Sequence, residues 1–225
     1  MKKIILSVVA VTSCFFAVHS QKCTYYFPVK QGTTLEMKTY DAKDKVVGTV
    51  KQVVTGKTDN SVKFNSEYID KDGKSISKGD YEVKCQNGEF VVDMSNYTRN
   101  MDLSSYKDME IKMETEDMSI PAMPQPGQQL KDGAVRMKIS NSMMTVMNMS
   151  VKILNRKVEG YEDVTTPAGT FKCLKISYNV ESKMVFTVRG KGIEWISEKA
   201  GTVKSESYSE KGKLQSHTLL TSIKE

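Results

Sequence analysis

Histidine is nearly absent from this sequence, which has only two among its 225 residues. One of them, His19, lies in an N-terminal segment typical of a secretory signal, so the exported chain would keep only His217. A Ser-His-Asp or Cys-His triad needs a histidine as its proton shuttle. His217 stands in a polar stretch with no nucleophile motif near it. The sequence therefore argues against enzymes of these classes and offers no catalytic residue.

Residues that hold metals and cofactors are also sparse. A zinc site needs at least three closely spaced ligands from histidine and cysteine, and the cysteines beyond residue 20 are far apart. There is no glycine-rich phosphate loop. Acidic side chains are abundant, but nothing in their spacing singles out a pair for hydrolysis. We therefore expect no cofactor, and no metal site built from histidine, cysteine or carboxylate side chains.

Long apolar runs and concentrated charge are missing beyond the N-terminal segment. No later run approaches the roughly 18 to 20 residues that a membrane-spanning helix needs. The net charge is +6, and two of these charges belong to Lys2 and Lys3, which leaves +4 for the remainder. Basic and acidic side chains alternate, whereas a nucleic-acid-binding surface clusters its basic residues. We expect no nucleic-acid partner and a chain that does not span the membrane.

The N-terminal segment, residues 1–20, has the layout of a cleaved signal peptide. Two lysines precede an apolar run over residues 4–18, and small residues follow before Gln21. Cleavage between Ser20 and Gln21 would leave a single all-β domain over residues 21–225 in the periplasm or outside the cell. The alternative is a lipid anchor on Cys14. We favour cleavage, because the apolar run continues after Cys14, where a lipoprotein normally turns polar.

The exported part alternates like a series of half-buried strands. Leu35, Met37 and Thr39 alternate with charged or polar neighbours, which is the period of a β-strand. Asn87-Gly88 lies between two strand-like runs and predicts a tight hairpin, because both residues accept positive φ. A proline-rich stretch over residues 120–127 predicts an extended excursion in the middle of the chain. We predict an antiparallel meander of about ten strands that forms a strongly curved half-barrel or a sandwich.

Three cysteines remain after signal cleavage, so one disulfide and one free thiol are expected in an oxidising compartment. In an antiparallel meander the first strand starts, and the fourth strand ends, at the same end of the sheet. Cys23 precedes the first predicted strand and Cys85 ends the fourth. We therefore predict a Cys23–Cys85 bridge and a buried free thiol at Cys173.

Methionine is the unusual component, since ten of the fourteen lie between Met101 and Met149. Three interpretations stay open: ordinary core filling, an adaptable apolar groove, and capture of a soft metal ion. Core filling is favoured, because these residues share the parity of neighbouring apolar positions. The residues that would line the groove are Met137, Met143, Met147 and Met149.

Several motifs together resemble a known family. Residues 165–173, with the run Pro167-Ala-Gly-Thr-Phe171, are the most specific of them, and they are joined by Glu194-Trp195-Ile196, by Arg156-Lys-Val-Glu-Gly160 and by the opening Cys23-Thr-Tyr-Tyr. The chain resembles the TapB-like group of secreted bacterial envelope proteins, related to domain of unknown function 3108. The resemblance implies an exported, β-rich, non-enzymatic protein and carries no catalytic or binding residues.

Export, apolar methionine-rich strands and missing catalytic groups together favour a binding protein. We expect a lipid or other apolar ligand, or an envelope protein partner, on a concave face of the sheet. The alternative is a structural or assembly component of the envelope without a small-molecule ligand.

Overall fold

The computed structural model describes residues 23–98, 101 and 103–225. The predicted signal segment, its cleavage site at Ser20 and Gln21, and Cys14 lie outside the described residues. Thirteen strands form one antiparallel sheet, rather than about ten. Their bounds are β1 (Thr34–Asp41), β2 (Val46–Lys57), β3 (Ser61–Asp70), β4 (Ser75–Gln86), β5 (Glu89–Val92), β6 (Glu110–Glu116), β7 (Met118–Ile120), β8 (Gly133–Ser140), β9 (Thr145–Thr166), β10 (Gly169–Lys183), β11 (Thr187–Ser197), β12 (Gly201–Ser209) and β13 (Leu214–Lys224).

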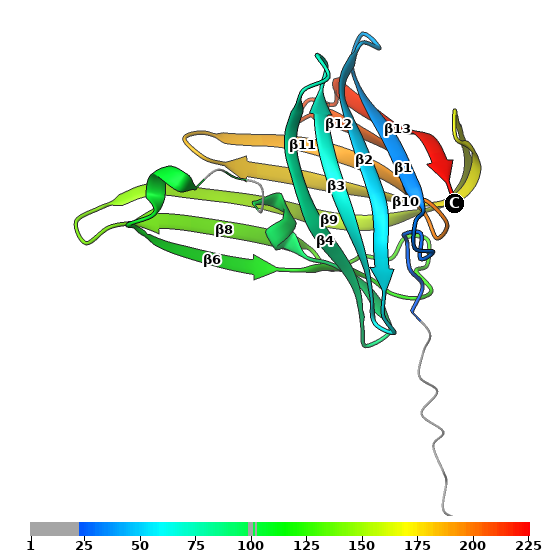
Figure 1. The fold of residues 1–225 in the computed structure, drawn as a ribbon. Coiled ribbons are helices and arrows are strands. Elements are labelled where there is room, and N and C mark those ends of the chain that lie inside the picture. Colours follow the sequence, from blue (N-terminus) through cyan, green and yellow to red (C-terminus); the bar gives the residue numbers. More distant parts are fainter. Residues whose placement is uncertain (1–22, 99–100, 102) are drawn as a thin grey trace, which may run out of the picture.

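The order of strands in the sheet explains its curvature. The sheet runs β6-β8-β9-β10-β11-β12-β13-β1-β2-β3-β4-β5-β7, so β6 and β7 are its two edges. These edge strands are consecutive in the chain, and only Asp117 separates Glu116 from Met118. The two edges must therefore meet, which curls the sheet into a nearly closed barrel (Figure 1). This confirms the predicted all-β, antiparallel and strongly curved architecture.

The hairpins follow the turn chemistry of the sequence. Asn87 and Gly88 have φ of 53° and 80° and connect β4 to β5, as the sequence predicts. Gly169, with φ of 131°, begins β10 after the Pro167-Ala168 turn, and Phe171 packs against the main core. The middle excursion contains two short 3-10 turns, η1 (Met94–Tyr97) and η2 (Ser104–Tyr106). It also contains what we call the connector, residues 121–132 between β7 and β8, which includes the proline-rich stretch.

The predicted disulfide and free thiol are confirmed. Cys23 and Cys85 form a bridge that ties the segment before β1 to the end of β4, and Cys173 is a buried free cysteine. Burial raises the pKa of the Cys173 thiol to about 11, with Asp163 and Glu162 adding to the shift. A thiol in this state is a structural rather than a reactive group.

A bulge in β9 changes which side chains face the interior. Ile153 is buried, and regular alternation would bury Asn155 next. Asn155 instead has φ of 54°, and the pairing of β9 with β10 shifts at this point. As a result Arg156 and Val158 are the buried residues that follow, at 4% and 0% exposure.

The positive φ of Asn155 in this bulge can be tested by substitution. Asn155→Val should lower the free energy of unfolding by about 1–2 kcal/mol, because a β-branched residue tolerates the left-handed conformation poorly. Asn155→Gly should leave stability nearly unchanged, since glycine adopts this conformation freely. Urea unfolding followed by circular dichroism measures both. Equal stability of the valine and glycine variants would contradict the assigned bulge.

Candidate functional site: a pocket inside the curled sheet

The interior of the curl is not completely filled by side chains. A pocket of about 230 Å³ lies between strands from both halves of the sheet. Its apolar walls include Phe64 and Val83 from one half and Ile153 and Ile176 from the other. Ile120 of the edge strand β7 and Phe90 of its neighbour β5 also line it. The pocket therefore exists because the sheet curls until its edges meet.

Arg156 is the dominant polar group of this pocket. Its Nη1 donates hydrogen bonds to the carbonyl oxygen of Ser119 in β7, at 3.0 Å, and to that of Lys131 in the connector, at 2.6 Å. Burial lowers the pKa of this guanidinium, and the nearby Glu194 carboxylate opposes that change. Arginine has five N–H donors, so two backbone acceptors leave part of its donor capacity free for a ligand.

Three further side chains complete what we call the polar cluster: Tyr97, Tyr178 and Glu194, which line the same pocket as Arg156. Burial raises the pKa of Tyr178 above its usual value, and Glu194 raises it further. Burial and the charge of Glu194 also raise the pKa of Tyr97, although half of the surface of this side chain is accessible. Glu194 accepts a hydrogen bond from Thr202 Oγ1 at 2.7 Å.

The backbone around Arg156 is fixed by the connector. The amide of Leu130 donates to the Arg156 carbonyl at 2.8 Å, and the amide of Val158 donates to the Gln128 carbonyl at 2.9 Å. The connector thus takes the place of a neighbouring strand along this part of β9. It brings the Lys131 carbonyl next to the guanidinium.

The methionines predicted to form a groove lie elsewhere, and that interpretation is wrong. Met137 and Met149 are buried together with Ile139 in a separate cluster, against which Met147 packs. Met143 is 87% exposed in the turn between β8 and β9. The groove fails because Leu103, Tyr106 and Met109 of the middle excursion cover this part of the sheet. The favoured alternative, core filling, holds for Met137 and Met149.

Trp195 and His217 are also accounted for structurally. Trp195 is 4% exposed and donates a hydrogen bond to Glu162, while the ammonium groups of Lys175 and Lys204 lie 5.0 and 4.6 Å from its ring centre. It neighbours Glu194 in β11, so the two side chains point to opposite faces and Trp195 lies outside the pocket. His217 stacks on Tyr40 at 5.0 Å between ring centres.

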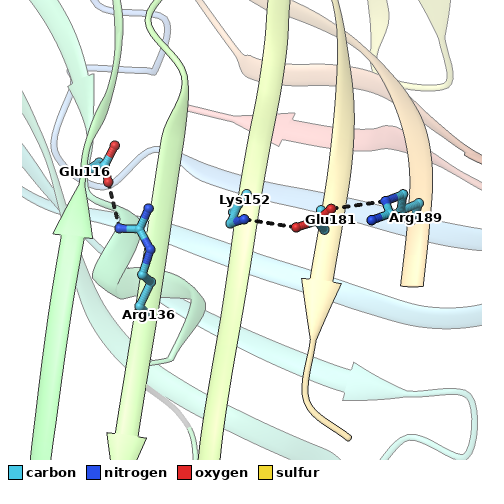
Figure 2. A network of polar contacts seen from close by, with 5 residues as sticks. All are labelled: Glu116, Arg136, Lys152, Glu181 and Arg189. Atoms are coloured by element: carbon cyan, nitrogen blue, oxygen red, sulfur yellow. Dashed lines mark hydrogen bonds and ion pairs between the residues drawn. The ribbon is translucent and has the colours of Figure 1, made fainter. Parts of the chain in front are cut away.

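The outer surface of strands β6, β8, β9, β10 and β11 carries a row of ion pairs. Glu116 binds Arg136 at 2.6 Å, and Glu181 binds Lys152 at 3.0 Å and Arg189 at 3.1 Å. Figure 2 shows these residues side by side on neighbouring strands. Such exposed pairs contribute little stability, about 0–1 kcal/mol each. They mark this face as the solvated one.

Within the described part of the chain, no group of three or more metal-ligating side chains is present.

The sequence that forms this fold matches a known protein family. The DUF3108-like family model matches residues 30–220. The chain belongs to the DUF3108-like family. This confirms the relation to domain of unknown function 3108 that the motifs indicated. No curated protein matches the chain, and among the described residues no helix is long and apolar enough to cross a membrane.

Two solved structures of similar sequence share the fold of this family member. One is a protein of Parabacteroides distasonis described as a candidate lipoprotein, with 28% identity and a TM-score of 0.73 over 91% of this chain and all of that one. The other, from Bacteroides fragilis, is described as a candidate exported protein with a YmcC-like fold. It has 26% identity and a TM-score of 0.72 over 90% of this chain and all of that one. Both descriptions agree with a place in the cell envelope.

Sequence reasoning missed the polar cluster. Arg156 lies between Asn155 and Lys157 in a run that looks solvent-exposed, and only the bulge turns its side chain inward. Arg156 and Glu194 both lie in motifs that resemble the family, but the resemblance assigns them no binding role. An arginine next to an asparagine within a long strand is a weak signal, because asparagine is one of the few residues that adopt positive φ.

The hydrogen bonds of Arg156 to the Ser119 and Lys131 carbonyls should contribute measurably to stability. Arg156→Met should lower the free energy of unfolding by about 2–4 kcal/mol, because it leaves the Ser119 and Lys131 carbonyls without their buried donor. Arg156→Lys should lose less, since an ammonium can still reach one carbonyl. Chemical denaturation of both variants measures the difference. A methionine variant as stable as the unmodified protein would show that these hydrogen bonds do not hold β7 to β9.

Proposed function

We propose that this protein is an exported binding protein without catalytic activity, and that it holds one small amphipathic ligand inside the curled sheet. The observation that carries the proposal is the pocket of about 230 Å³, with apolar walls and a buried guanidinium. Ligand sites commonly combine apolar walls with a few polar groups that fix the orientation of the ligand. The polar cluster supplies such groups on one side of this pocket.

The chemistry of the pocket indicates the ligand class. Its apolar walls suit an acyl or ring system, and the free donors of Arg156 suit a small acceptor group such as a carboxylate, a phosphate or a carbonyl. The volume is below the roughly 300–1,000 Å³ of pockets for drug-sized molecules. The proposed ligand is therefore a small one, or one branch of a larger lipid.

Native mass spectrometry tests this proposal. Protein purified without detergent should carry a bound mass that organic extraction removes. Val92 lines the pocket, so Val92→Phe should fill part of it and reduce the bound fraction severalfold. The matched control is Val53→Phe, because Val53 is 40% exposed and lies outside the pocket lining. A ligand-free protein, or equal occupancy in both variants, would refute the proposal.

Processing at the N-terminus decides whether the protein is free or anchored. We propose cleavage before Gln21, on the apolar run that continues past Cys14. The description of the Parabacteroides relative as a candidate lipoprotein makes Cys14 the competing site. Intact-mass measurement of the exported protein should give the unmodified chain from Gln21. A chain that begins with an acylated Cys14 would contradict this expectation.

A further inference from the structure

Two hairpin turns expose large apolar side chains that no part of the described chain covers. In the turn between β8 and β9, Met143 is 87% and Met144 is 63% exposed. In the turn between β10 and β11, Met184, Val185 and Phe186 are 55%, 83% and 80% exposed. We call these two groups the apolar tips. Side chains of this size are exposed together where a protein meets a partner or a membrane.

The apolar tips lie at the same end of the sheet. Figure 1 shows the lime and gold hairpins protruding in the same direction, away from the segment that leads to β1. Lys183 lies next to the second tip and pairs with Ser150 of β9. Strand β9 extends five residues beyond this pair, to Thr145 beside the first tip. The tips are therefore staggered by about 17 Å along the strands.

The surroundings of the second tip are positively charged. Lys183 lies directly before Met184 and has no ion-pair partner among the described residues. Farther from the tip, Lys152 and Arg189 share the single carboxylate of Glu181 (Figure 2). With Lys183, this part of the sheet has three cations and one anion. Lys138 near the first tip is also exposed and unpaired in the described part of the chain, Glu110 there is paired with Lys112, and the exposed Asp108 follows the exposed Lys107.

We propose that the apolar tips dock the protein onto an anionic lipid bilayer. Apolar side chains inserted at the acyl boundary gain the free energy of leaving water, and nearby lysines are attracted to anionic headgroups. The inference goes beyond the proposed ligand binding and stands without it, because none of the tip residues lines the pocket.

The shape and charge of the tips favour a bilayer over a protein partner. The tips are narrow turns that project separately, whereas a stable protein interface needs a continuous, complementary surface of about 800 Å² per partner. Residues 141–146 and 184–188 contain no charged side chain, and the flanking cations supply complementarity to an anionic surface. These two features together describe an interfacial anchor.

Vesicle co-sedimentation of the full protein tests the proposal. Vesicles of phosphatidylcholine with one third phosphatidylglycerol should bind the protein, and pure phosphatidylcholine should bind it more weakly. The double variant Val185→Asp/Phe186→Asp should lose at least about tenfold in partitioning, since it removes two apolar groups and adds negative charge. The matched control is Ile76→Asp, because Ile76 is 54% exposed in β4 and lies in neither tip.

A second measurement locates the contact itself. Phe186→Trp places a second fluorophore in the chain, in addition to the buried Trp195, and its emission should shift to the blue and be quenched by brominated lipids. The proposal is overturned if the introduced tryptophan is not quenched, or if the unmodified protein binds neither kind of vesicle. It is also overturned if the double variant binds as well as the control, or if its only change is loss of self-association in light scattering.

Discussion

Asp117 joins the two edge strands of a thirteen-stranded sheet, and most of the architecture depends on this short connection. An open sheet of this size would keep its edges far apart. Because β6 ends at Glu116 and β7 begins at Met118, the edges meet and the sheet has to curl. The Asp117 carboxylate also accepts a hydrogen bond from the Met94 amide at 3.0 Å, which fixes the entry to η1 beside this junction. The interior of the curl is the consequence, and the pocket lies there.

Arg156 stabilises this arrangement from β9. Its guanidinium reaches from β9 to the Ser119 carbonyl of the edge strand β7, so it links two strands that are far apart in the order of the sheet. A buried cation costs several kcal/mol of desolvation unless hydrogen bonds compensate. Two backbone carbonyls and the field of Glu194 provide that compensation here. The same group that holds the edge in place gives an otherwise apolar pocket its polar side.

Local patterns predicted most of the strands, the Asn87-Gly88 hairpin and the Cys23–Cys85 bridge, because alternation, turn chemistry and meander geometry all depend on neighbouring residues. They did not predict β6, which is exposed along its whole length, or the edge-to-edge junction at Asp117. The polar cluster was missed for a related reason. A single residue with positive φ at Asn155 reverses the inside-outside pattern of β9, and alternation alone carries no sign of that reversal. The methionine groove failed because a segment remote in sequence covers the methionines.

The central claim is that the curled sheet encloses a ligand whose polar group meets Arg156. A crystal structure of protein isolated with its natural ligand tests this most directly. We predict continuous density between Phe64 and Ile176, with an acceptor atom within hydrogen-bond distance of the Arg156 guanidinium. Density for ordered water alone in this pocket, with the ligand bound elsewhere on the molecule, would contradict the account.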